Sequence, residues 1–251
     1  GRLGEPPVNQ ALLDWLARQF VEGGWSIKRM HRLIMLSSAY QMSSDWDARA
    51  AEADPDNKLL WRANRRRLEG EAIRDAVMAA AGNLDLSGGG SILTYKDRQY
   101  VSDTAKGGDI DYERNIRSVY IPVIRSSLYD VFQAFDMPDP AVSNGDRDST
   151  VVAPQALFSM NGPTVLRHTR VMAESLLARE DLDDAGRIRW AYERALARPP
   201  APAETDRALT FLGSVERALA SGKADAAERR LSAWQSFAKA LLASNEFIYV
   251  N

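Results

Sequence analysis

Apolar residues recur along most of the chain at the three- and four-residue spacing of an α-helix. Near the start, this spacing predicts one helix that begins after Asn9 and ends at Gly23, and a second that begins after Ser26. Asn and Ser are favoured N-cap residues, because their side chains accept hydrogen bonds from the first free N–H groups of a helix. Each helix gathers apolar residues on one face, namely Leu12, Leu13, Leu16 and Phe20 in the first and Ile27, Met30, Leu33 and Ile34 in the second.

The rest of the chain is also mainly helical in its pattern. Helices are predicted over residues 68–81, 128–135, 155–160, 164–178, 184–196, 202–220 and 226–243. Residues 180–184 are acidic and typical of a loop. We therefore expect a helical main body over residues 1–180 and a C-terminal helical subdomain over residues 181–251 packed on it, with one single domain as the alternative.

Residues 84–118 break the helical pattern. They are rich in glycine, and the short stretches 99–102 and 118–121 are typical of strands that pair as a hairpin. The predicted fold is mainly α, an irregular domain of about eight to ten helices with one small β-hairpin near residues 99–121. A polar loop over residues 136–150 interrupts the helices.

Charge and cysteine content exclude some classes of function. The 251 residues include 32 basic and 34 acidic side chains, a net charge of −2, which argues against a general nucleic-acid binder. The absence of cysteine excludes disulfides, thiolate metal sites and covalent haem attachment within these residues. No apolar run approaches the ~18 residues of a membrane span. The chain begins with Gly1 rather than Met, so we expect it to be truncated at its N-terminus.

The loop over residues 136–150 is the most polar stretch. Its alternating oxygen-bearing residues resemble the ligands of a calcium loop, and they are Asn144, Asp146, Asp148 and Thr150. Ser149 stands where such a loop needs glycine, and Gln155 stands where it needs a bidentate glutamate. The alternative is a solvated loop in which these side chains bond their own backbone.

Two carboxylates of the same loop are candidates for catalysis. Asp136 and Asp139 could serve as the general acid and base that cleave a glycosidic bond. Carboxylates are common in loops, so an active pair would also need perturbed pKa values.

The arginine run at residues 65–67 is a candidate anion site. Arg62, Arg65 and Arg66 could bind a phosphate, a sulfate or a carboxylate, or a partner that carries one. The alternative is that some of the arginines pair with Asp54, Asp56 or Glu69 while the others are solvated.

Tryptophans and histidines favour structural roles. Helical patterns contain five tryptophans, which are more typical of a core than of a sugar platform, and they are Trp15, Trp25, Trp61, Trp190 and Trp234. His31 and His168 lie in predicted helices without a metal-binding spacing, so we expect packed or surface residues.

Several segments together are similar to a known family. They are Gly4-Glu5-Pro6-Pro7, Leu12-Leu13-Asp14-Trp15-Leu16, His31-Arg32-Leu33-Ile34, Asp54-Pro55-Asp56-Asn57, Asn64-Arg65-Arg66-Arg67-Leu68, Phe135-Asp136-Met137-Pro138-Asp139-Pro140, Ala195-Leu196-Ala197-Arg198-Pro199-Pro200 and Ser244-Asn245-Glu246-Phe247. The chain resembles the C-terminal domain of unknown function of large planctomycete proteins. In that family the domain follows a planctomycete-type cytochrome c domain.

The resemblance implies an exported protein of the periplasm or cell envelope, with haem only on a neighbouring domain and no cofactor in this chain beyond a calcium candidate. It implies no reaction. We therefore expect an accessory or interaction domain whose partners are neighbouring domains of the parent protein, a polysaccharide or another protein. One alternative is a hydrolase or lyase that acts on an extracellular polysaccharide through the carboxylates of residues 136–148. The other is a protein–protein scaffold that uses the C-terminal helices.

Overall fold

The fold is given by a computed structural model that describes residues 6–88, 92, 111–124, 128–144, 147–222 and 225–250. The chain forms two compact units, Gly1–Arg66 and Arg67–Val250. The boundary suggested by the sequence near residue 180 falls inside the second unit. Each unit is described below by itself.

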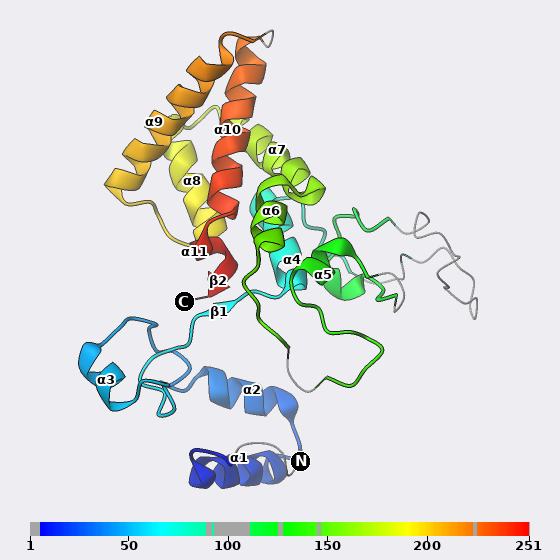
Figure 1. Cartoon of the computed structure of the whole chain (residues 1–251), viewed down its shortest axis with the longest axis vertical. Coiled ribbons are helices and arrows are strands. Elements are labelled where there is room, and N and C mark those ends of the chain that lie inside the picture. Colours follow the sequence, from blue (N-terminus) through cyan, green and yellow to red (C-terminus); the bar gives the residue numbers. More distant parts are fainter. Residues whose placement is uncertain are drawn as a thin grey trace. The chain divides into compact units, whose positions relative to one another are not determined.

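The first unit contains helices α1 (Gln10–Glu22), α2 (Ile27–Met35) and α3 (Ala48–Ala53) (Figure 1). Both predicted caps are confirmed: the Asn9 side chain accepts a hydrogen bond from the N–H of Leu12, and the Ser26 hydroxyl accepts one from the N–H of Arg29. Helices α1 and α2 contact each other, yet neither contains a buried residue. The apolar faces that define these helices are therefore largely exposed.

The tryptophan prediction is only partly right. Trp234 is fully buried, but the side chains of Trp15 and Trp25 are 42% and 67% exposed. The physical reason is that this unit has too few elements around α1 and α2 to cover them, so the helical spacing produces an apolar face without a core behind it.

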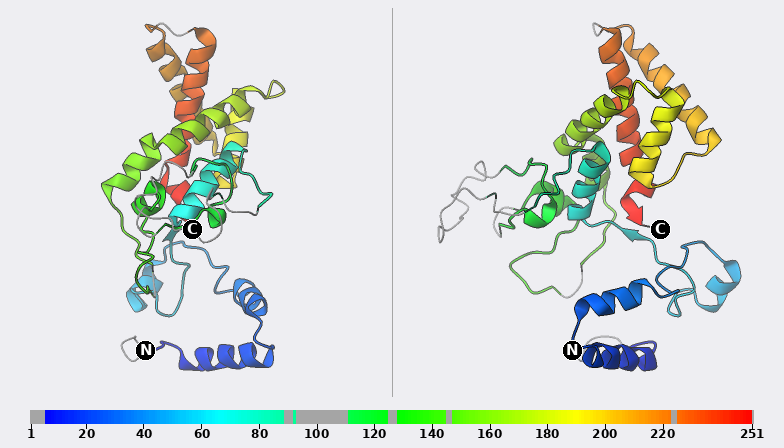
Figure 2. Two further views of the ribbon diagram at one scale, coloured as in Figure 1. Left: turned by 90° about the vertical axis from the view of Figure 1, so that its right-hand side faces the viewer. Right: turned by 180° about the vertical axis from the view of Figure 1, so that it is seen from behind.

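The second unit contains the remaining helices. They are α4 (Gly70–Ala81), α5 (Asp130–Ala134), α6 (Ala153–Asn161), α7 (Pro163–Leu177), α8 (Asp184–Leu196), α9 (Pro202–Leu219), α10 (Ala226–Leu242) and α11 (Asn245–Ile248). Helix α10 packs against α7 and α9, and α4 packs against α7 (Figures 1 and 2). The core between them includes the fully buried side chains of Trp234, Met172, Leu176 and Ile188. The predicted mainly helical class is confirmed.

One small two-stranded sheet completes the described fold. It pairs β1 (Arg66–Arg67) with β2 (Tyr249–Val250), and the N–H of Leu68 donates to the carbonyl of Ile248 beside it. One small β element is thus confirmed, but it joins segments that are far apart in sequence. Pairing between such segments leaves no local turn signal, so the sequence could not indicate it.

The predicted hairpin near residues 99–121 is not where this β element lies. Residues 99–110 lie outside the described part of the chain, and Ser118–Tyr120 form a 3₁₀ helix rather than a strand. The reason is that both the N–H and the hydroxyl of Ser118 donate to the carboxylate of Asp75 on α4. These bonds use the backbone group that a strand would need for its partner.

No helix in the described ranges has both the length and the apolar character needed to cross a membrane.

Candidate functional site

The loop between α5 and α6 begins at Asp136, whose carboxylate is held by several donors. Its φ of 58° places the backbone in the left-handed region, which Asp tolerates better than most residues. Arg67 Nη2 lies 2.5 Å from Oδ2, and Thr150 donates its N–H to Oδ2 and its hydroxyl to Oδ1 over 2.8 and 2.7 Å. The side-chain amide of Gln155 adds a longer contact of 3.4 Å. Asp136 thereby fixes both ends of the loop.

These contacts keep Asp136 ionised. Burial raises the pKa of the Asp136 carboxyl, but the hydrogen bonds from Thr150, the charge of Arg67 and the amide of Gln155 outweigh it and hold the pKa below its ordinary value. A general acid needs a raised pKa, so this carboxylate has the wrong shift for that role. The structure gives Asp136 a positioning role in the loop.

Replacing Asp136 tests this role. We expect Asp136→Asn to lower the free energy of unfolding by about 1–2 kcal/mol, because the amide keeps the shape but loses the charged acceptor that Arg67 needs. Urea denaturation followed by circular dichroism measures the change. Asp139→Asn is the matched control, with an expected change below about 0.5 kcal/mol. Equal losses in the two variants would contradict the role of Asp136.

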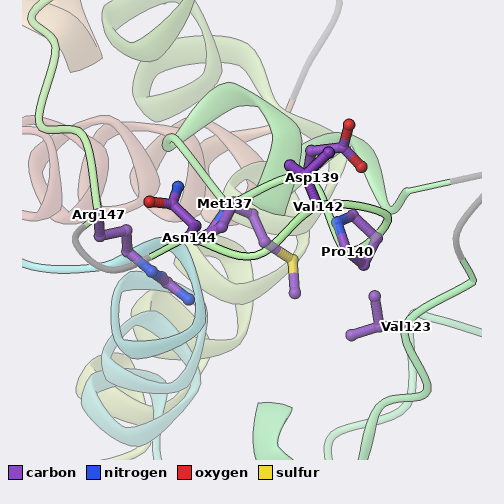
Figure 3. A pocket seen from close by; sticks show the side chains of 8 residues that line it. Val123, Met137, Asp139, Pro140, Val142, Asn144 and Arg147 are labelled. Carbon is purple, nitrogen blue, oxygen red and sulfur yellow. The ribbon is translucent and has the colours of Figure 1, made fainter. Parts of the chain in front are cut away.

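Asp139 makes contacts of its own that do not involve Asp136. Its Oδ1 accepts the N–H of Ala141 at 2.8 Å, which is an Asx turn within the loop. It borders an open hollow of about 580 Å³ whose wall also includes Met137, Asn144 and Arg147 (Figure 3). Figure 3 shows Asp139 and Arg147 at opposite ends of this hollow. Among the residues that the structure describes, two converging carboxylates therefore do not line this hollow.

Arg147 joins the loop to helix α4. Its Nη1 and Nη2 atoms form two bonds of 2.7 and 2.8 Å with the carboxylate of Glu71, and Glu69 lies 3.4 Å from Nη1. The hydrogen bonds from Arg147 lower the pKa of Glu71 despite partial burial. No local pattern indicates this pair, since its members are separated by more than seventy positions.

The calcium candidates are only partly brought together. Thr150 uses its hydroxyl on Asp136, and Asp146 lies outside the described residues. Asn144 and Asp148 both lie in the loop, and Asn144 has an interaction partner of its own. Within the ranges that the structure describes, no group of three or more His, Asp or Glu side chains is placed to hold a metal ion.

The anion candidates of the arginine run lie in different environments. The guanidinium of Arg62 lies between two rings, 4.8 Å from the centroid of Trp46 and 4.9 Å from that of Trp61. Arg65 and Arg66 are exposed. Arg62 thus has a packing role in the first unit, whereas Arg65 and Arg66 remain available at the surface.

A second polar cluster, which the sequence did not indicate, surrounds Glu113. The Tyr129 hydroxyl donates to this carboxylate over 3.0 Å, the Thr164 hydroxyl over 3.1 Å, and Arg167 forms an ion pair of 3.0 Å with it. Arg167 also contacts the ring of the fully buried His168. These groups satisfy one another, so the cluster ties residues 111–118 to α7 rather than presenting a free nucleophile.

The contacts of His168 assign its tautomer. Arg167 Nη2 lies 3.1 Å from Nε2, and because a guanidinium can only donate, Nε2 must accept. The proton is then on Nδ1, which donates to Oδ1 of Asn83 at 3.1 Å. Burial first and the charge of Arg167 second lower the pKa of His168 to about 4, which agrees with a neutral ring.

Comparison with known proteins gives a family and nothing more specific. No curated protein and no solved structure matches the chain. One family model matches residues 1–212, which is most of the chain. The chain belongs to this family, PSD1, described as "Protein of unknown function (DUF1553)".

Proposed function

We propose that this chain is an accessory domain that binds a neighbouring domain of its parent protein through the apolar faces of α1 and α2. The observation that carries the proposal is that neither helix buries a residue. The exposed side chains include Leu12, Leu13, Trp15, Ile27, Leu33 and Ile34. Exposed apolar side chains gathered on helix faces favour an interaction site in a folded protein.

The chemistry of the partner follows from the other face of α2. Lys28, Arg29 and Arg32 lie opposite Ile27 and Ile34 on the helix, and none of the three forms an ion pair with a described residue. The apolar face of α2 fits the apolar face of an amphipathic helix. The unpaired cations on the opposite face of α2 fit a second, acidic surface of the partner. We assign both to the neighbouring domain.

Other parts of the proposal rest on the resemblance of the segments given above. It supports a parent protein that is exported to the periplasm or cell envelope and that has a cytochrome c domain elsewhere in its chain. In that setting haem binds to the neighbouring domain, and this chain contributes contacts rather than redox chemistry.

Hydrogen exchange tests the proposal. Amides of α1 and α2 should exchange at least ten-fold more slowly in the parent protein than in this chain alone, because a covered helix opens less often. The double variant Leu13→Glu, Ile34→Glu should remove the difference, whereas Arg18→Glu on the polar face of α1 should keep it. Equal exchange in the parent protein and the isolated chain would show that no neighbouring domain covers these helices.

A further inference from the structure

A small recess lies in the second unit and is lined by residues of α6 and of the segment that contains α11 and β2. Its volume is about 190 Å³. This is smaller than the ~300–1,000 Å³ of sites for drug-sized ligands, so a molecule of only a few heavy atoms would fit. The wall is formed by Arg67, Phe135, Val151, Val152, Gln155, Ala156, Ser159, Met160, Ala243, Asn245, Ile248 and Tyr249.

Arg67 is the group in this wall that lacks partners. Its side chain is 5% exposed, and the guanidinium lies 5.3 Å from the centroid of the Phe135 ring. Nη2 donates to Asp136, but the buried Nε and Nη1 have no hydrogen-bond partner in the part of the chain that is described. Buried donors are nearly always paired in folded proteins, so unpaired ones indicate a group that is missing from the protein alone.

The unpaired donors of the recess favour a ligand with strong acceptor atoms, such as a carboxylate. Arg67 is its one charged lining residue among those described, and no carboxylate lines it. The nearby Asp136 already accepts hydrogen bonds from Arg67 and Thr150, so its oxygens do not compete for Nε and Nη1. Asn245 and Tyr249 add side chains that can donate.

Most of the remaining wall is apolar. Val151, Val152 and Met160 border the recess and are exposed to solvent. We infer that the recess binds a small carboxylate with a short branched apolar chain, with its carboxylate on Arg67 and its chain against the valines and Met160. The apolar wall favours the branched hydrocarbon part of the ligand, and the guanidinium favours its carboxylate. This site is independent of the surface of α1 and α2.

NMR titration of the whole chain tests the inference. The probe is 3-methylbutanoate, and the Arg67 Nε–H resonance should move and saturate as the probe is added. The uncharged 3-methylbutanamide should bind at least ten-fold more weakly, because it lacks the charge that Arg67 attracts. N-acetylleucine, which imitates the carboxyl end of a peptide, shows whether a free acid or a chain terminus binds more tightly, and either order supports a carboxylate site.

Substitutions distinguish binding in the recess from binding at the exposed surface. Ala156→Leu should fill the recess and weaken binding at least ten-fold while it leaves Arg67 in place. The double variant Arg67→Met, Asp136→Asn should abolish binding without leaving an unpaired buried charge. Arg66→Met is the matched control and should bind as the native chain does. Absent saturation, equal binding of the amide, or unchanged binding in Ala156→Leu would overturn the inference.

Discussion

Arg74→Met is expected to lower the free energy of unfolding by about 3–5 kcal/mol, the largest loss of any single change considered. The Arg74 side chain is 1% exposed, and its guanidinium holds the segment after residue 110 onto α4. Nη2 donates to the carbonyls of Tyr112 and Arg114 at 2.9 and 2.5 Å, and Nη1 donates to the carbonyl of Ile116 at 2.9 Å. Methionine fills the space but leaves three carbonyls without a donor.

Urea denaturation followed by circular dichroism measures this loss. The matched control is Arg207→Met on the exposed surface of α9, where we expect a change below about 0.5 kcal/mol. A second readout is hydrogen exchange, in which the amide of Ser118 should lose protection, because Arg74 no longer holds the carbonyls of residues 112–116 and Asp75 alone keeps this segment on α4. A loss in Arg74→Met as small as that of the control would show that the carbonyl contacts do not hold the segment.

Acid should weaken the fold through His168 before it affects the carboxylates. The pKa of His168 is about 4 in the folded chain, and its ordinary value is 6.5. Between these two pH values the histidine is therefore protonated in the unfolded chain and neutral in the folded chain. The stability present above pH 6.5 is therefore lost as pH falls toward 4. Between pH 7.5 and pH 5 we expect a loss of about 2 kcal/mol from this residue.

The variant His168→Gln separates this effect from other titrations. Gln cannot take up the proton, so the His168 part of the pH dependence should disappear, although the variant is less stable at pH 7.5. His31→Gln is the control, because His31 is exposed on α2, and it should keep the full dependence. Carboxylates with lowered pKa values, such as Glu71, act only below about pH 4.5. An unchanged slope in His168→Gln would rule out the histidine as the cause.

The two predictions concern neighbouring parts of one polar network. Arg74 holds the carbonyls of residues 112–116, and Glu113 from the same segment binds Tyr129, Thr164 and Arg167. Since residues in one network do not act independently, the losses in Arg74→Met and His168→Gln should not be additive when combined.

The candidate site was predicted only in part. The loop over residues 136–150 was recognised by its composition, and Asp136 does organise it. Its partners were not recognised, because Arg67 and Gln155 come from β1 and α6 and are brought together only by packing. Asp139 is used in a local turn, as the alternative interpretation of the loop expected. The calcium and polysaccharide hypotheses remain predictions.

The sequence by itself determined most of the helices and their approximate ends, but not the short helices α3 and α11. The predicted helix over residues 184–196 is α8, and the cap residues Asn9 and Ser26 act as expected. Helical spacing and capping are local properties, since they depend on residues three or four positions apart. Spacing alone could not tell that the apolar face of α10 is buried while those of α1 and α2 are exposed.

Tertiary structure decided that difference and the polar contacts between distant segments. The pairs Arg147–Glu71, Arg67–Asp136 and His168–Asn83 each join residues more than sixty positions apart. Such pairs have no sequence signal, because burial raises the cost of an unpaired charge only after the helices have packed. The unpaired donors of Arg67 are likewise visible only in the folded chain, since the recess beside them is formed by four separate segments.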